Sequence, residues 1–270
     1  KSFLILLGLD YSLKNINKLI KKFSQKIFNK ITVAFPQNLE TKFFLNRLKV
    51  KKINHIGNLK FAENNYYDQD KISDNLKFQL KNKKIWIASS THAQEEIFCA
   101  KAHIELKKNV KNLITIIIPR HVHRSKKIIS KIKKLNLKVT SHSSNIQNLK
   151  DIDIYIVDTF GETKKFHKLG STVFLGGSII RRGGQNPLEA ARYGAKILHG
   201  PNTDNFKDVY KILKLFNLSK KITTHKQLAS SITFKKNKNI GIKIKKIGGI
   251  ILKKTIKELD YLINNEFKKT

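Results

Sequence analysis

The chain has 270 residues, of which 40% are hydrophobic and 9% aromatic, and its formal net charge is +36 at pH 7. This apolar share is enough to build a folded core and excludes general disorder. No run reaches the ~18 apolar residues that a membrane-spanning helix requires. The single cysteine, Cys99, excludes an internal disulfide framework and is typical of a reducing compartment.

The positive charge comes mainly from lysine, because only six of the 55 basic residues are arginine. A nucleic-acid-binding surface typically combines a basic stripe containing arginines with stacking aromatic side chains. Here the lysines are spread over every segment, which indicates a compositional bias and predicts no nucleic-acid partner. We expect attraction to an anionic membrane surface instead, by roughly 1 kcal/mol for each basic residue near it.

The first part of the chain alternates between strand and helix patterns. It begins at Lys1 without a methionine, and residues 3–9 already read as a core strand. We therefore expect upstream strands and interpret the chain as the C-terminal part of a longer protein. Ser12 can cap the first helix. The predicted strands cover residues 3–9, 31–35 and 50–56, and the predicted helices 13–27 and 38–48.

A polar stretch at residues 62–72 predicts a linker, after which the alternation resumes. This pattern predicts an α/β fold with two doubly wound Rossmann-like domains, the first only partly present. We place the domains at residues 1–65 and 73–245, with a C-terminal helix at 246–270. The later predicted strands are 84–88, 113–118, 138–140, 152–157, 172–175 and 196–199, and the helices are 93–106, 125–135, 187–193, 205–216 and about 250–266.

Polar loops follow four strands of the predicted second domain. In a doubly wound sheet, ligands bind beyond the carboxyl ends of the strands, so these loops are the candidate site. In the first loop, Thr91 and Gln94 have the spacing of a capping box, which predicts a helix beginning there. The four loops contain residues 89–92, 119–121, 158–162 and 176–178.

The segment Gly183-Gly184-Gln185-Asn186-Pro187-Leu188-Glu189-Ala190 follows the fourth of these loops. Two glycines let a backbone approach a phosphate, and Pro187 suits the first helical position, where free N–H groups attract anions. Glu189 is then placed to accept hydrogen bonds from ribose hydroxyls. Taken alone, the segment fits equally well a glycine loop with an asparagine cap, in which Glu189 complements the helix dipole. The other three loops favour the nucleotide site.

Several other polar residues have simpler interpretations. Arg120, at a strand end, is expected to contact a phosphate or carboxylate, because its planar guanidinium can donate two hydrogen bonds to such a group. The histidines at 92, 121 and 123 are not accompanied by cysteines or carboxylates that would complete a zinc site, so we expect no metal. Asp151 and Asp153 lie at the start of a strand and are interpreted as solvated turn carboxylates. Trp86 is expected in the core, and Cys99 is expected to be a small buried residue.

Together these segments resemble the 3-deoxy-D-manno-octulosonic acid (Kdo) transferase family of lipopolysaccharide assembly. The resemblance covers nearly the whole chain and depends on the order and spacing of several motifs. The motifs are Gly57-Asn58-Leu59-Lys60-Phe61, Trp86-Ile87-Ala88-Ser89-Ser90-Thr91-His92, Pro119-Arg120-His121, Asp158-Thr159-Phe160-Gly161-Glu162, Gly176-Gly177-Ser178, the segment from Gly183 to Ala190, and Gly200-Pro201.

This resemblance implies a two-domain GT-B fold and a metal-independent transfer without a cofactor. Kdo would pass from CMP-Kdo to a lipid A precursor at the cytoplasmic face of the inner membrane, to which this chain would bind peripherally. By motif, CMP would be held by Pro119, Arg120, Phe160, Gly161, Glu162, Asn186, Pro187, Leu188 and Glu189. The supporting residues would be Ser90, Thr91, His92, Gly177, Ser178, Gly183, Gly184 and Gln185.

The resemblance also assigns Lys60 to stabilise developing negative charge. The family's proton-accepting glutamate lies upstream of the motifs present here, so we expect this fragment to bind donor without turning it over. Two departures stand out: Gln185 occupies the place of a usual histidine, and residues 6–12 lack an Asn-Ala-Arg run. A GT-B transferase with another nucleotide sugar is the alternative, and a cationic nucleic-acid-binding protein is the alternative from another class.

Overall fold

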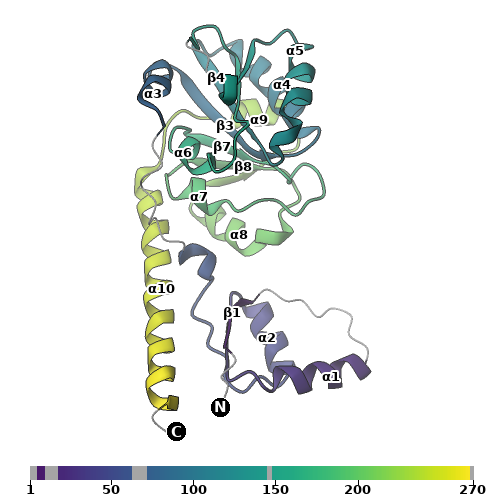
Figure 1. Ribbon diagram of the computed structural model, residues 1–270, viewed down its shortest axis with the longest axis vertical. Helices are drawn as coiled ribbons and strands as arrows, with labels where there is room; N and C mark the ends of the chain where they lie inside the picture. The colour runs from purple at the N-terminus through teal and green to yellow at the C-terminus, as the bar shows by residue number, and fades with distance from the viewer. Residues whose placement is uncertain (1–4, 10–17, 63–71, 145–147, 268–270) are drawn as a thin grey trace. The chain divides into compact units, whose positions relative to one another are not determined.

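The computed structural model describes residues 5–9, 18–62, 72–144 and 148–267 (Figure 1). It divides into unit 1, formed by Lys1–Asn65 with Lys243–Thr270, and unit 2, formed by Tyr66–Ile242. Ser12 and most of the predicted linker lie outside the described residues. Each unit is described by itself below.

Unit 1 contains a small parallel sheet and the helices that follow its strands. Strand β1 (Ile5–Leu9) pairs in parallel with β2 (Val33–Pro36), as predicted. Helix α1 covers Lys18–Phe28 and α2 covers Leu39–Arg47. The Asn38 side chain caps α2 by accepting a hydrogen bond from the Thr41 N–H at 2.7 Å. Because an asparagine cap satisfies a helix-start N–H, this boundary was readable from the sequence.

The predicted strand at residues 50–56 is wrong. Within this segment Ile53 forms an isolated β-bridge with Ala34. The Ala34 N–H donates to the Lys52 carbonyl, and the Asn54 N–H donates to the Ala34 carbonyl. Val50 and Ile53 nevertheless pack into a small core with Ala34 of β2 and Leu45 of α2. Beyond them the Asn54 side chain donates to Glu258 Oε2 at 2.9 Å, and the chain enters the 3-10 turn η1 (Leu59–Ala62). This segment therefore buries apolar side chains without forming a β-strand.

The C-terminal helix α10 (Lys238–Phe267) begins well before the predicted start near residue 250. Glycine disfavours helix interiors, yet α10 runs through the glycines at 241, 248 and 249. In the structure Gly248 lies against the backbone of Phe61, and a Cβ there would clash with the Phe61 carbonyl oxygen. Further along, Leu259 and Leu262 pack on Val33 and Phe35 of β2. Within the described ranges, neither α10 nor another helix has the length and apolarity to cross a membrane.

Unit 2 is built on a parallel sheet of seven strands in the order β5-β6-β4-β3-β7-β8-β9 (Figure 1). The central strands are rich in apolar residues, and every residue of β4 is buried. Such continuous burial is typical of a parallel sheet covered on both faces. The strands are β3 (Lys84–Thr91), β4 (Leu113–Pro119), β5 (Val139–Ser141), β6 (Ile154–Ile156), β7 (Thr172–Leu175), β8 (Lys196–His199) and β9 (Ser219–Lys221).

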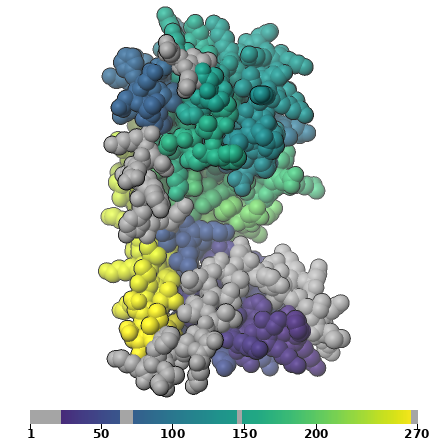
Figure 2. Space-filling model, viewed as in Figure 1, coloured from purple at the N-terminus to yellow at the C-terminus, as the bar shows by residue number. Residues whose placement is uncertain are grey.

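Helices cover both faces of this sheet. Trp86 and Cys99 are fully buried in a core shared by the strands and helices α4, α5 and α9, so both predictions are confirmed. Figure 2 shows that the earlier, teal part of unit 2 and its later, green part meet over a continuous surface. The helices are α3 (Asp74–Leu80), α4 (Glu95–Lys107), α5 (Ser125–Lys133), α6 (Thr163–His167), α7 (Leu188–Ala191), α8 (Lys207–Leu215) and α9 (His225–Ser231).

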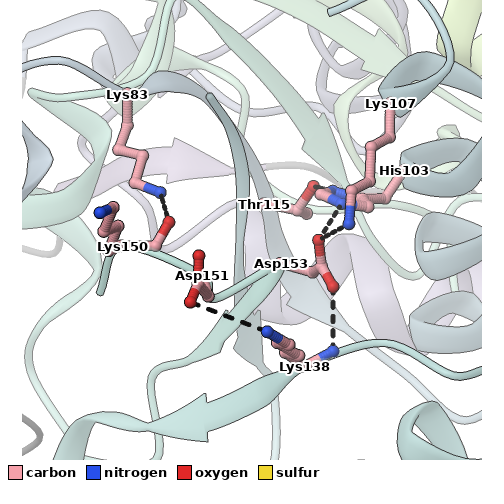
Figure 3. A network of polar contacts seen from close by, with 8 residues as sticks. All are labelled: Lys83, His103, Lys107, Thr115, Lys138, Lys150, Asp151 and Asp153. Atoms are coloured by element: carbon pink, nitrogen blue, oxygen red, sulfur yellow. Dashed lines mark hydrogen bonds and ion pairs between the residues drawn. The ribbon is translucent and has the colours of Figure 1, made fainter. Parts of the chain in front are cut away.

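Asp153, predicted to be a solvated turn carboxylate, is instead 4% exposed at the amino end of β6. Figure 3 shows its carboxylate between Lys107, His103 and the Lys138 backbone. The Lys107 Nζ and the Lys138 N–H donate to it, and His103 Nε2 lies 3.4 Å away. Burial raises the pKa of Asp153, but these donors outweigh it and hold the pKa well below its usual range. Asp151 is exposed, as predicted.

Candidate functional site

The carboxyl ends of β3, β4 and β7 lie along one edge of the sheet of unit 2. Strand β3 is central, with β4 on one side and β7 on the other. The chain proceeds from β3 to β4 and later returns to place β7 against β3, so the strand order reverses here. Ligands of doubly wound sheets bind in the crevice at such a switch point. The predicted loops after β3 and β7 therefore flank the expected binding position.

Glu95, the first residue of α4, joins these two loops and was missed by the sequence analysis. It is fully buried, and its Oε2 accepts hydrogen bonds from the N–H of His92 at 2.9 Å and of Gly177 at 2.7 Å. Its Oε1 accepts from the N–H of Ser178 at 3.1 Å and of Ile179 at 3.0 Å. Four charge-assisted bonds to backbone donors compensate for burying the carboxylate. They fix the loop after β7 relative to the loop after β3.

The predicted capping box is wrong, and Glu95 explains why. Thr91 Oγ1 is buried without a hydrogen-bond partner, and the N-cap position falls on Gln94, whose side chain makes no cap bond. The Glu95 carboxylate accepts from the backbone of His92 instead, three residues earlier. Gln94 has φ 80°, a left-handed conformation that a non-glycine residue rarely adopts. Strain at this position accompanies the tight turn into α4.

The loop after β7 places several predicted residues together. Gly177 has φ +65°, and a Cβ there would lie 3.4 Å from Gln185 Nε2 and 3.5 Å from His92 Cδ2. The Gly184 N–H donates to the Gly177 carbonyl at 2.9 Å, which closes the loop on itself. The Ser178 hydroxyl donates to the Leu175 carbonyl and accepts from the Gly200 N–H at 2.8 Å. His92, Gly177 and Gln185 therefore share one small region.

The loop after β4 lies beside the loop after β3. Pro119 ends β4, and the Arg120 N–H donates to the Thr91 carbonyl at 2.9 Å, while the Arg120 side chain is exposed. The rings of His92 and His121 are 5.7 Å apart. Burial lowers the pKa of His92, so its imidazole is predominantly neutral at pH 7. The exposed guanidinium fork of Arg120 is suited to bind an anion at this strand end.

The loop after β6 contains Asp158. Burial raises the pKa of this carboxyl, but the hydroxyl and the N–H of Ser143 donate to it and lower the pKa below its usual value. Phe160 is 82% exposed and Gly161 follows it. Glu162 Oε1 lies 3.1 Å from Lys165 Nζ in α6. The exposed ring and glycine leave backbone and aromatic surface accessible at this strand end.

Helix α7 is shorter than predicted, with a single turn over Leu188–Ala191. Pro187 precedes this turn as its N-cap, and Asn186 Oδ1 already accepts from the Leu188 N–H at 3.1 Å. The start of this turn therefore offers fewer free N–H groups and a smaller dipole than a longer helix would. Glu189 lies in this turn, with its Oε2 3.7 Å from His167 Nδ1 in α6.

Lys60 belongs to unit 1, where it lies in the 3-10 turn η1 and is half-buried. Its N–H donates to Asn58 Oδ1 at 2.9 Å, which shapes the turn. Over the ranges that the structure describes, no group of three or more His, Cys, Asp or Glu side chains is placed to hold a metal ion.

The chain was compared with known proteins. No family model matches it. A 3-deoxy-D-manno-octulosonic acid transferase from Rickettsia prowazekii is 34% identical over 229 residues, covering 83% of this chain and 49% of that protein. The transferase of Haemophilus influenzae is 28% identical over 197 residues, covering 72% of this chain and 46% of that protein. This chain belongs to the family of these Kdo transferases. It spans about half the length of the curated relatives it matches.

Solved structures agree with the fold of this Kdo transferase relative. The C-terminal CMP-Kdo binding domain of WaaA from Acinetobacter baumannii matches with a TM-score of 0.54 at 22% identity, covering 66% of this chain and 92% of that one. Anabaena HepE in complex with UDP matches with a TM-score of 0.52 at 11% identity, covering 96% of this chain and 72% of that one. Identities this low establish the fold alone, which is the α/β fold of GT-B glycosyltransferases.

Proposed function

We propose that this chain is the donor-binding part of a Kdo transferase. The whole protein would move Kdo from CMP-Kdo to a lipid A precursor in lipopolysaccharide biosynthesis. The observation that supports this most is the assembly of strand-end loops at the switch point of unit 2, joined by Glu95, in a chain 34% identical to a Kdo transferase over 229 residues. The name of the Acinetobacter baumannii domain, CMP-Kdo binding, supports the same donor.

The chemistry of the donor suits these loops. CMP-Kdo carries a phosphodiester and a carboxylate, and transfer of Kdo develops negative charge on the leaving phosphate. Arg120 is exposed in the loop after β4, where its N–H donates to the Thr91 carbonyl, and its side chain would supply a cation for this charge, with Pro119 as the neighbouring CMP contact. Glu189 would accept hydrogen bonds from the ribose hydroxyls. The remaining CMP contacts are assigned to Phe160, Gly161, Glu162, Asn186, Pro187 and Leu188, with the loop from Gly177 to Gln185 and residues 90–92 in support.

We assign the acceptor side and the location in the same proposal. Residues 1–65 would contribute to the acceptor domain and residues 73–245 to the donor domain, with Lys60 stabilising transition-state charge. A phosphorylated lipid acceptor places the reaction at the cytoplasmic face of the inner membrane. The formal net charge of +36 supports attraction to that anionic surface.

A binding titration of this chain with CMP tests the donor assignment. Followed by thermal unfolding, binding of CMP should stabilise the chain by about 2.7 kcal/mol at a hundredfold excess over the dissociation constant. UMP and single-stranded DNA are the comparison ligands. If UMP stabilises the chain and CMP does not, the result would favour a GT-B enzyme that uses another nucleotide sugar. Stabilisation by DNA alone would favour the nucleic-acid-binding alternative.

Two substitutions test the assigned residues. Arg120→Ala should weaken CMP binding about tenfold or more, because charge-assisted hydrogen bonds contribute ~1.5–3 kcal/mol. Glu189→Gln should weaken it less, because the amide oxygen still accepts. Arg47→Ala is the matched control, since it removes the same charge from an exposed position in α2 of unit 1. Equal CMP affinity in all of these variants would refute the residue assignments.

A further inference from the structure

His167 occupies a buried position directly behind the candidate site. It is the last residue of α6 and is 2% exposed. Its Nε2 lies 3.0 Å from the hydroxyl oxygen of Ser89, a fully buried residue of β3. Its Nδ1 faces α7, 3.7 Å from Glu189 Oε2. One ring therefore joins the central strand, the helix after β6 and the turn that carries Glu189.

The surroundings decide which ring nitrogen carries the proton. Burial lowers the pKa of His167 to about 4, so the ring is neutral at pH 7 and has one donor and one acceptor. A lone pair on Nδ1 would face the Glu189 carboxylate and be repelled, whereas an N–H there is attracted. The Ser89 hydroxyl can then donate to Nε2. The hydrogen bond at one ring nitrogen fixes the tautomer at the other.

The Nδ1 contact is close to a hydrogen bond without being one. Its 3.7 Å separation exceeds the ~2.7–3.2 Å range of N–H···O bonds, and Nδ1 is buried without another hydrogen-bond partner. Leaving a buried donor unpaired costs ~1–3 kcal/mol. The bond forms when the Glu189 carboxylate comes nearer to Nδ1. Polar contacts in unliganded sites often tighten in this way when ligand binds.

We propose that His167 is a positioning residue, whose Nδ1–H, held by the Ser89 hydroxyl at Nε2, directs the Glu189 carboxylate into the binding site at the carboxyl edge of the sheet. The consequence for donor binding rests on the proposed function of Glu189. The tautomer and its dependence on Glu189 are properties of the folded chain and can be measured without any ligand.

The first experiment is nitrogen-15 NMR of histidine-labelled chain at pH 7. We expect the His167 resonances of the Nδ1–H tautomer, the minor form of free histidine in water. Glu189→Ala should shift the population toward the Nε2–H form, whereas Glu40→Ala, an exposed glutamate of α2, should leave it unchanged. A protonated ring, an Nε2–H ring in the unaltered chain, or no response to Glu189→Ala would overturn the proposal, whatever the ligand of the site.

The second experiment separates positioning from packing. His167→Phe keeps a ring of similar size without nitrogens, and His167→Asn keeps an N–H near the Nδ1 position. We expect the first to weaken CMP binding about tenfold, equal to ~1.4 kcal/mol, and the second to restore most of the affinity. Urea unfolding measures the stability of each variant beside its affinity. Equal losses in both variants, or none in His167→Phe, would overturn the proposal. If the unaltered chain does not bind CMP, the proposed function fails and the NMR result still decides the role of His167.

Discussion

Two of the buried carboxylates of unit 2 lie at opposite ends of the same sheet, Glu95 beyond the carboxyl ends and Asp153 before β6. Glu95 is fully buried and Asp153 is 4% exposed. Asp153 contacts two side chains, of Lys107 and His103, and one backbone N–H, of Lys138. The same helix, α4, supplies Glu95 at its start and both of those side chains near its end.

The partners differ in kind, and this difference separates stability from function. Side-chain partners at Asp153 tie α4 to the start of β6, so their loss affects how firmly the sheet and helix hold together. Backbone partners at Glu95 belong to the loops after β3 and β7, so the carboxylate sets the shape of those loops. We therefore expect substitutions at Asp153 to change stability alone, and substitutions at Glu95 to change both stability and binding.

Glu95→Gln should have the largest effect. The substitution preserves volume but turns an amide NH₂ toward backbone N–H groups that need an acceptor. We expect the free energy of unfolding to fall by about 3 kcal/mol, since two of the four bonds are lost and each bond to a charged group contributes ~1.5–3 kcal/mol. Binding of CMP should be lost with the shape of the loop after β7. Urea unfolding and a CMP titration measure the two effects.

Glu105→Gln is the control for this substitution, because Glu105 lies on the same helix and pairs with Lys108 at the surface. It should leave both stability and CMP affinity close to those of the unaltered chain. A Glu95→Gln chain that binds CMP normally would show that the loop keeps its shape without the carboxylate, and the comparison between the two ends of the sheet would lose its meaning.

Asp153→Asn should have the next largest effect, confined to stability. The amide keeps one oxygen acceptor but loses the charge that attracts Lys107, so we expect a loss of about 2 kcal/mol in the free energy of unfolding. Binding of CMP should stay unchanged at temperatures where the variant is folded. Weakened binding in a fully folded Asp153→Asn chain would contradict the separation proposed here.

The pH dependence of unfolding sharpens the same point. The folded-state pKa of Asp153 lies below its unfolded value, so the unfolded chain binds more protons at acid pH and stability falls as pH is lowered. The contribution is fully present above the ordinary aspartate pKa of ~3.9 and is lost as pH falls below it. Urea unfolding at several pH values between about pH 6 and pH 3 gives the free energy of unfolding as a function of pH. This free energy should fall less steeply with decreasing pH in Asp153→Asn than in the unaltered chain. Equal slopes would show that Asp153 does not gain its donors on folding.

Much of unit 2 was predictable because hydrophobic runs and glycine-rich turns specify a parallel α/β sheet locally. The runs at Leu113–Pro119 and Thr172–Leu175 are buried throughout and need no long-range information. Strand β9, with the sequence Ser-Lys-Lys, was missed because it is an edge strand held by backbone pairing to β8. Helix α10 was predicted too short, and two of the glycines inside it, Gly241 and Gly248, let the backbone of another segment approach closely.

The site was predictable as a set of loops but not as a network. The position of Arg120, Gly177 and Gln185 at strand ends follows from the order of elements along the chain. The role of Glu95 does not, because three of its hydrogen-bond donors are N–H groups about eighty residues later, at Gly177 to Ile179. Asp153 was misread for the same reason, since Lys107 and His103 reach it from a preceding helix. Buried carboxylates paired over long sequence distances leave no local pattern.

Gln94→Gly should have the smallest effect, and its direction is opposite to the others. Gln94 adopts φ 80° and ψ −31° immediately before Glu95, and its side chain is exposed. Strain at such a position costs ~1–3 kcal/mol, while glycine gives back part of this through the greater entropy of the unfolded chain. We expect a net gain of about 1 kcal/mol in the free energy of unfolding, with CMP affinity unchanged. Gln94→Ala is the matched control, because it removes the same side chain but keeps the Cβ and therefore the strain. If both variants unfold at the same urea concentration, the backbone conformation before Glu95 is not strained, and Glu95 alone accounts for the shape of this turn.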